Sequence, residues 1–164
     1  MKRFASLLLV FAVFVSTATA QPTIFIVRHA EKGAATSTNP GTNDPDLSDA
    51  GRARAESLAK MLKDAGITVI YATEFKRTQQ TAEPLAKILG IKLTIVPAKD
   101  TATLSAKLRD LPGNALVVGH GNTVPELIKA LGVDTPINIA ETDYDNFFVV
   151  VIDQKPHLLQ LHYR

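Results

Sequence analysis

Two arginines and two histidines are the side chains of this sequence best suited to chemistry: Arg28, His29, Arg77 and His120. Each follows, directly or after a short turn, a run of apolar residues typical of a buried strand. Four such side chains in one crevice would repel one another unless an anion lay among them. A phosphoryl group supplies that negative charge, and arginine binds its oxygens in a bidentate geometry. The four residues therefore predict a phosphoryl-binding site.

Apolar runs are expected to form the strands that carry these residues. Residues 24–27 and 115–118 are unbroken apolar runs, which are typical of strands buried on both faces of a parallel sheet. In open α/β sheets ligands bind outside the carboxyl ends of the strands. We therefore expect Arg28, His29 and His120 at one edge of the sheet. In the simpler alternative, Arg28 and His29 only solvate the end of a strand.

The rest of the pattern alternates between strands and helices. Further strands are predicted over residues 67–71 and 92–96, and an antiparallel hairpin over 146–152 and 158–163. Helices are predicted over residues 48–63, 74–89, 101–109 and 123–131. The expected fold is α/β: a three-layer α/β/α sandwich with a mostly parallel central sheet and a C-terminal antiparallel hairpin, in one domain over residues 21–164.

Several details of the first two helices are also expected. Ser48 is predicted as the N-cap of the first helix and Thr73 as the cap of the second. Pro84 lies too deep in the second helix for a first-turn proline, so a kink or break is expected there. The candidate buried positions of the first helix are Ala53, Leu58, Met61 and Leu62. The polar stretch over residues 32–45 is expected to form a lid or rim over the site, or a loose insertion.

Residues 1–20 have the pattern of a cleavable signal peptide. Lys2 and Arg3 precede an apolar run over residues 4–15, which is too short to span a bilayer comfortably, and small residues follow at 18–20. The mature chain is expected to begin at Gln21, to be periplasmic or secreted, and to have no stable membrane anchor after cleavage. The sequence contains no cysteine, so neither a lipidated N-terminus nor a disulfide framework is possible.

Composition and charge narrow the possible partners. The sequence has 164 residues, of which 46% are hydrophobic and 21% charged, a composition typical of one globular domain. Residues 1–20 hold two of the 18 basic residues and none of the 16 acidic ones, so the mature chain has no formal net charge. This balance argues against a nucleic-acid partner, which would require an excess of positive charge.

Four motifs in this order resemble the histidine phosphatase superfamily, also called the phosphoglycerate mutase-like fold. They are residues 27–31, 47–55, 72–82 and 118–122, and the resemblance covers essentially the whole mature chain. It implies that His29 is the nucleophile that becomes phosphohistidine, and that Arg28, Arg77 and His120 hold the phosphoryl group. Ala30 stands where the family usually has glycine, as in small bacterial members resembling phosphohistidine phosphatases, so we expect an exported member of that branch.

These implied roles are chemically reasonable. A neutral imidazole is a competent nucleophile toward phosphorus and divides hydrolysis into two displacements. Charge on the equatorial oxygens needs cations already in place, which Arg28, Arg77 and a protonated His120 would provide. No metal or other cofactor is required. A metal site of two histidines and Glu31 is the chemical alternative, but a metal ion there would face repulsion from two arginines.

The acid that protonates the leaving group is the least determined residue. Phytase-like relatives place it directly after the second histidine, where this chain has Gly121. Mutase-like relatives take a glutamate some way beyond the second arginine, a region that offers Asp100 at the end of a strand. Glu74 is the other candidate, with Asp100 slightly preferred. In the simpler alternative, Asp100 and Glu74 are carboxylates with no catalytic role that stand at helix N-termini because the helix dipole favours negative charge there.

The expected function is a metal-independent phosphomonoester hydrolase acting through phosphohistidine. The substrate class is a phosphorylated small molecule, glycan or protein, because similar exported members act on sugar phosphates of lipopolysaccharide and cytoplasmic ones on phosphohistidine. The alternative is a non-catalytic phosphoryl-binding module of the same fold. Because the stretch between Arg77 and His120 is short and lacks a capping insertion, we expect a shallow, open site.

Overall fold

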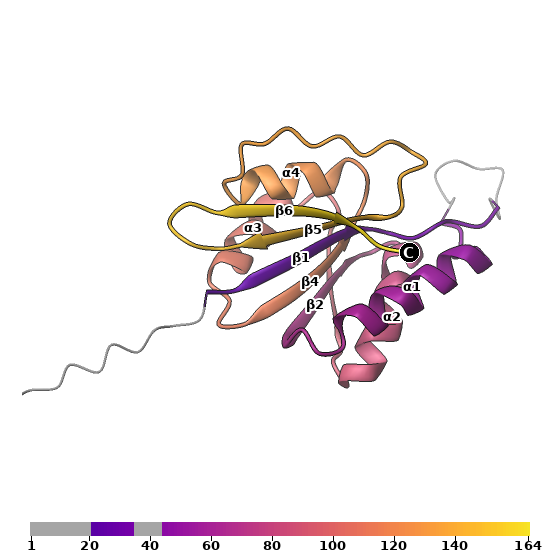
Figure 1. Ribbon diagram of the computed structural model, residues 1–164. Coiled ribbons are helices and arrows are strands. Elements are labelled where there is room, and N and C mark those ends of the chain that lie inside the picture. Colours follow the sequence, from indigo (N-terminus) through magenta and orange to yellow (C-terminus); the bar gives the residue numbers. More distant parts are fainter. Residues whose placement is uncertain (1–20, 35–43) are drawn as a thin grey trace, which may run out of the picture.

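The computed structural model describes residues 21–34 and 44–164 (Figure 1). The expected signal peptide and most of the loop over residues 32–45 lie outside the described residues. The elements are β1 (Thr23–Arg28), α1 (Asp49–Leu62), β2 (Ile67–Thr73), α2 (Lys76–Leu89), β3 (Leu93–Val96), α3 (Thr101–Arg109), β4 (Asn114–Gly119), α4 (Thr123–Ala130), β5 (Asn146–Val151) and β6 (His157–His162). In the described part of the chain, each helix is too short or too polar to cross a membrane.

A six-stranded sheet in the order β3-β2-β4-β1-β5-β6 forms the middle layer. Strands β3, β2, β4 and β1 are parallel, and β5 and β6 add an antiparallel hairpin beside β1. Helices α1 and α2 cover one face of the sheet and α3 and α4 the other (Figure 1). The predicted three-layer α/β fold with a C-terminal hairpin is therefore confirmed.

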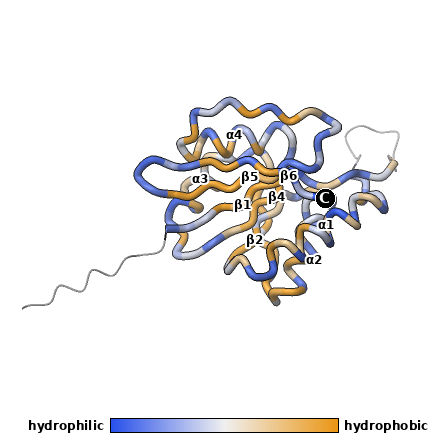
Figure 2. The backbone as a smooth tube through the Cα atoms, in the orientation of Figure 1, coloured by the Kyte–Doolittle hydropathy of each residue, from blue (hydrophilic) through white to orange (hydrophobic). Residues whose placement is uncertain are grey.

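The central strands are apolar on both sides because both faces of the sheet are covered. Ile24 and Ile26 of β1 pack toward α3 and α4, whereas Val27 packs toward α1 and α2. All three side chains are fully buried, as expected when successive residues of a strand point to opposite faces. Figure 2 shows the apolar residues concentrated along these strands. This packing makes the C-terminal end of β1 a rigid support for the residues that follow it.

Helix α1 begins as predicted but buries a different face. Ser48 is the N-cap, and its hydroxyl accepts a hydrogen bond of 3.1 Å from the amide of Gly51. Leu58 and Leu62 are buried as expected, whereas Ala53 and Met61 are exposed, so these two predictions are wrong. The helix contacts its neighbours along one stripe, on which neither Ala53 nor Met61 lies. Its members are Gly51, Ala55, Leu58, Ala59 and Leu62.

Helix α2 is continuous through Pro84, so the break allowed by the sequence analysis does not occur. A proline removes only one backbone hydrogen bond, and burial of the flanking residues Thr81, Ala82, Leu85 and Ala86 holds the helix in place. The predicted cap is also wrong. Phe75 occupies the N-cap position without a side-chain hydrogen bond, whereas Thr73 belongs to β2 and faces the site.

Candidate active site

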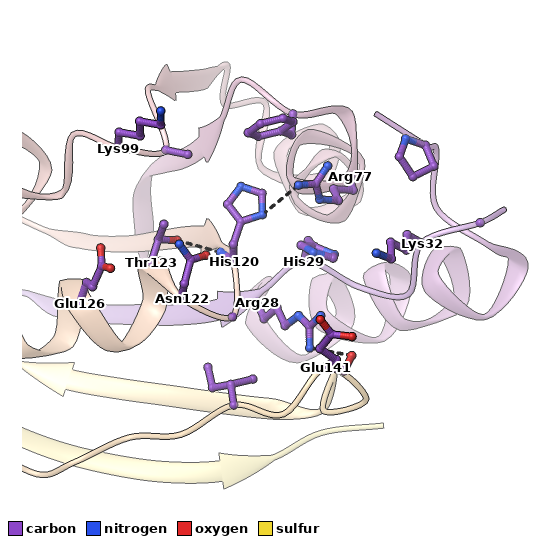
Figure 3. Close-up of a pocket in the computed structure, with 16 residues that line it drawn as sticks. Arg28, His29, Lys32, Arg77, Lys99, His120, Asn122, Thr123, Glu126 and Glu141 are labelled. Atoms are coloured by element: carbon purple, nitrogen blue, oxygen red, sulfur yellow. Dashed lines mark hydrogen bonds between the residues drawn. The ribbon is translucent and has the colours of Figure 1, made fainter. Parts of the chain in front are cut away.

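The carboxyl ends of three strands bring the predicted residues together. Arg28 and His29 follow β1, His120 follows β4, and Arg77 lies in the first turn of α2 after β2 (Figure 3). All four line one cavity of about 920 Å³. The ring centroids of His29 and His120 are 5.4 Å apart. The structure therefore brings together the four side chains that the sequence analysis singled out.

The His29 ring is buried and held in one orientation. Its Nδ1 lies 2.8 Å from the carbonyl oxygen of Ala30, and because a carbonyl can only accept, Nδ1 carries the proton. In the neutral ring Nε2 therefore has a free lone pair. Burial, together with the charges of Arg77, His120 and Arg28, lowers the His29 pKa to about 3. His29 is therefore neutral near pH 7, as a nucleophile must be.

The backbone around His29 is fixed from three sides. The amide of His29 donates to Gly119 of β4 at 2.9 Å, and the amide of Ala30 donates to the Thr81 hydroxyl at 2.9 Å. On the other side, the carbonyl of Glu31 accepts from the Ser48 amide at 2.9 Å. These contacts come from β4, α2 and the start of α1.

Gly51 allows α1 to approach this backbone closely. A Cβ at Gly51 would overlap the carbonyl oxygen of Glu31. Only a residue without a side chain lets the first turn of α1 pack against the chain that follows His29.

His120 is bonded on both ring nitrogens. Its Nε2 lies 2.9 Å from the Thr73 hydroxyl, and its Nδ1 lies 3.4 Å from Nη2 of Arg77, which can only donate (Figure 3). Nδ1 is therefore unprotonated and Nε2 carries the proton. Burial and the charge of Arg77 lower the His120 pKa to about 4, against an opposing effect of Glu74. Near pH 7 His120 is therefore neutral, and not protonated as the sequence analysis expected.

Arg77 is held by groups that the sequence analysis did not identify. Its guanidinium lies over the Phe75 ring, 4.4 Å from the centroid, and its Nη1 is 3.3 Å from Oδ1 of Asp44. The Asp44 carboxylate also accepts from the amide of Lys76 at 3.0 and 3.2 Å. Asp44 thus supplies the cap for α2 that Phe75 lacks, and orients Arg77 at the same time.

Arg28 is anchored by the segment before β5. Its Nη1 donates to the carbonyl oxygens of Ala140 and Glu141 at 2.7 and 2.9 Å, and its guanidinium lies 4.4 Å from the Tyr144 ring centroid. Its Nε is buried without a hydrogen-bond partner among the described residues. A buried N–H without a partner is costly, so this atom is a candidate donor to a bound anion.

Neither predicted acid lines the main cavity. Asp100 is the N-cap of α3, accepts from the Thr103 amide at 3.3 Å, and borders a separate cavity of about 20 Å³. Glu74 accepts from the amide of Ala98 at 2.8 Å, and its charge acts on both Arg77 and His120. The carboxylates that do line the cavity are the exposed Glu126 and Glu141, which the sequence analysis did not single out.

Glu31 does not belong to the site. Its carboxylate forms a bidentate pair with Arg54, with N···O distances between 2.8 and 3.0 Å. It borders a different surface groove, on the side of α1. The alternative metal site of His29, His120 and Glu31 is therefore not formed, because the carboxylate is committed to Arg54. Lys32 and Lys99 instead add positive charge at the rim of the cavity.

Comparison with known proteins identifies relatives of this chain. The profile of the Histidine phosphatase superfamily (branch 1) matches residues 24–100. An 8-oxo-(d)GTP phosphatase of Mycolicibacterium smegmatis is 31% identical over 65% of this chain and 36% of its own length. Phosphoserine phosphatase 1 of Hydrogenobacter thermophilus is 36% identical over 43% of this chain and 34% of its own length. The chain thus spans about a third of the length of these relatives.

Solved structures show the same fold at low sequence identity. The protein histidine phosphatase SixA, complexed with tungstate, superposes with a TM-score of 0.70 at 22% identity, covering 85% of this chain and 96% of SixA. A putative phosphohistidine phosphatase SixA from Agrobacterium tumefaciens gives 0.65 at 19% identity, covering 85% and 97%. By sequence, residues 24–100 therefore belong to the histidine phosphatase superfamily, and the described residues share the fold of these solved structures.

Proposed function

We propose that this chain is a phosphoric monoester hydrolase that works through a phosphohistidine intermediate on His29. The observation that carries the proposal is the state of the His29 ring: buried, neutral, with Nδ1–H bonded to the Ala30 carbonyl and Nε2 free. Two guanidinium groups and a second imidazole surround the same cavity. The relatives named as phosphatases support the same reaction class.

The reaction consists of two displacements at phosphorus. Nε2 of His29 attacks, a nitrogen–phosphorus bond forms, and the ester oxygen leaves with its electron pair. Water then attacks the phosphorus atom of phosphohistidine, the nitrogen–phosphorus bond breaks with its electron pair returning to Nε2, and inorganic phosphate and neutral His29 result. The bond from Nδ1–H to the Ala30 carbonyl persists throughout and stabilises the positive charge that the ring carries as phosphohistidine.

Positive charge on three sides stabilises the transferring group. Arg77 and Nε of Arg28 bind the equatorial oxygens from opposite sides of the cavity. With a pKa of about 4 His120 is neutral near pH 7. A dianionic phosphoryl group bound beside it would raise that pKa, because a negative charge favours the protonated ring. His120 therefore becomes a cation, or a hydrogen-bond donor, only when the substrate is present.

Glu74 is the better supported of the two proposed acids. Its charge is felt by both Arg77 and His120, and the amide it binds belongs to Ala98, which lines the cavity. Asp100 is occupied in capping α3 and borders the smaller cavity. The weak connection of both carboxylates to the cavity is also the observation that favours the second candidate function, a phosphoryl-binding module without turnover.

The substrate is proposed to be a phosphorylated small molecule, glycan or protein. The cavity is larger than a phosphoryl group needs. Its lining includes two positively charged side chains, Lys32 and Lys99, and two negatively charged ones, Glu126 and Glu141. Such a lining supports a substrate that presents polar groups around its phosphate.

A panel of phosphate esters tests both candidate functions. The purified chain from Gln21 onward should release inorganic phosphate from at least one ester, with unchanged rates after treatment with a metal chelator. A rate that disappears with the chelator and returns with a divalent ion would contradict metal-independent catalysis. Tight binding of phosphate with no turnover of any ester, and no phosphorylation of the protein, would establish the binding module instead.

Export through residues 1–20 is a separate proposal, based on the order of charged, apolar and small residues there. Mass spectrometry of protein recovered from the periplasm or the medium should show a chain beginning at Gln21. Recovery of the chain with its N-terminal segment intact in the membrane fraction would contradict cleavage.

A further inference from the structure

Thr81 joins the two halves of the site through one hydroxyl group. It lies on α2, one turn after Arg77, and its side chain is fully buried. The hydroxyl oxygen accepts from the amide of Ala30 at 2.9 Å. The same hydroxyl donates to the carbonyl oxygen of Arg77 at 2.7 Å. The single proton of Thr81 is thus committed to α2, which leaves its oxygen as an acceptor for the chain that carries His29.

Ala30 passes this connection on to the His29 ring. Its amide is held by Thr81, and its carbonyl oxygen accepts from Nδ1 of His29 at 2.8 Å. Three hydrogen bonds therefore run in sequence from the Arg77 backbone to the imidazole. The first two bonds share the Thr81 hydroxyl and polarise each other, whereas the third is linked to them through the backbone of Ala30, whose orientation they restrict. Ala30 itself is fully buried, so water does not compete for these groups.

We propose that Thr81 is a positioning residue for the nucleophile. Its hydroxyl sets the orientation of Ala30 relative to Arg77, and so keeps His29 in the Nδ1–H tautomer with Nε2 directed at the phosphoryl site. The catalytic consequence rests on the proposed function, whereas the effect on the His29 ring does not. A displacement of reacting atoms by about 1 Å can cost about 100-fold in rate, so a small change in Ala30 is sufficient.

The hydroxyl group, not the volume of the side chain, is the feature that matters. Thr81→Val keeps the shape but leaves the Ala30 amide without an acceptor in a buried place. Thr81→Ser keeps the hydroxyl and loses only a methyl group. Ser105→Ala is the matched control: Ser105 is also buried, and its hydroxyl also donates to a carbonyl of its own helix, Ala102 at 2.9 Å, but on α3 and away from the site.

The test is the nitrogen NMR spectrum of the His29 ring, recorded near pH 7 in the absence of ligand. The wild-type chain, Thr81→Ser and Ser105→Ala should show protonated Nδ1 and bare Nε2. Thr81→Val should show a mixture of tautomers. If Thr81→Val does not fold, Thr81→Ala is measured in its place. A wild-type ring protonated at Nε2, or a folded hydroxyl-free variant with the wild-type spectrum, would overturn the proposal.

Kinetics provide the second readout. In Thr81→Val, kcat for an ester hydrolysed by the wild-type chain should fall by about 100-fold with KM nearly unchanged, and Thr81→Ser should restore most of it. An equal loss in Thr81→Ser, or a rise in KM with unchanged kcat, would also overturn the positioning role. Absence of turnover in the wild-type chain would refute the proposed function, and the NMR measurement would still decide the role of Thr81.

Discussion

Asp44 and Arg77 form an ion pair of 3.3 Å at the candidate active site, with side chains that are 29% and 17% exposed. The carboxylate therefore offsets part of the positive charge that would attract an anion. It also accepts from the amide of Lys76 and so caps α2. These two roles can be separated by substitution.

The first prediction uses two variants of Asp44. Asp44→Asn keeps an oxygen for the Lys76 amide but removes the charge, so inorganic phosphate should inhibit a few-fold more strongly, since a partly exposed pair is worth about 1 kcal/mol or less. Asp44→Ala also removes the cap and should lower stability by about 1 kcal/mol, measured by thermal unfolding. Weaker inhibition of Asp44→Asn by phosphate would mean that the charge of Asp44 mainly orients Arg77.

The second prediction concerns the pH dependence of stability. Burial holds the pKa of His29 at about 3 and that of His120 at about 4 in the folded protein. Histidines of the unfolded chain have a pKa near 6.5 and bind protons below it, so the unfolded state takes up more protons as the pH falls. Stability should therefore decrease from about pH 6.5 down toward pH 4, by up to about 1.4 kcal/mol per pH unit for each ring.

Thermal unfolding at pH 7 and pH 5 measures this effect. His29→Gln should show a smaller loss of stability between the two values than the wild-type chain, because only one buried ring remains to be protonated on unfolding. Equal pH dependence of the wild-type chain and His29→Gln would contradict a neutral, buried His29.

The third prediction separates the two candidate acids by leaving group. A sugar phosphate needs a proton on the departing oxygen, whereas a nitrophenyl phosphate leaves as a stable anion. Glu74→Gln should therefore reduce hydrolysis of the sugar phosphate by about 100-fold to 10,000-fold while nearly sparing the nitrophenyl ester. Asp100→Asn should change the rates for both esters by the same factor, because this substitution alters only the N-cap of α3. The reverse pattern would make Asp100 the acid, and no selective loss in either variant would exclude both.

The positions of the strand ends could be predicted from the sequence, because apolar runs mark the buried strands and parallel strands place their carboxyl ends at one edge of the sheet. Ile24, Ile26, Val27 and residues 115–118 are buried between the two helical layers, so their unbroken apolar runs predicted the strands, and the positions of Arg28, His29 and His120 followed from the strand ends. Details of the helices were harder. Met61 and Pro84 show why: the buried stripe of α1 depends on where α2 packs, and tertiary packing tolerates a proline that local rules exclude.

The residues that hold the catalytic groups carry weaker sequence signals. Arg28 is held by backbone carbonyls of residues 140 and 141, and any residue type provides a carbonyl. Asp44 reaches α2 from a distant loop, so no local pattern joins them. Thr81 was visible within the motif over residues 72–82, but its bond to Ala30 depends on how α2 lies against β1. Glu126, in the first turn of the helix after His120, lines the cavity, but its local sequence does not distinguish it from any carboxylate favoured at a helix N-terminus.

The fourth prediction tests the central claim, a covalent phosphoryl group on His29. The chain is mixed with an ester carrying a radioactive phosphoryl group and denatured in alkali within the first turnover, and the label is located by peptide mapping. The label should be stable in alkali, labile in acid, bound to the peptide containing His29, and absent from His29→Gln. Turnover without any label, an acid-stable label on another residue, or full activity of His29→Gln would contradict the mechanism.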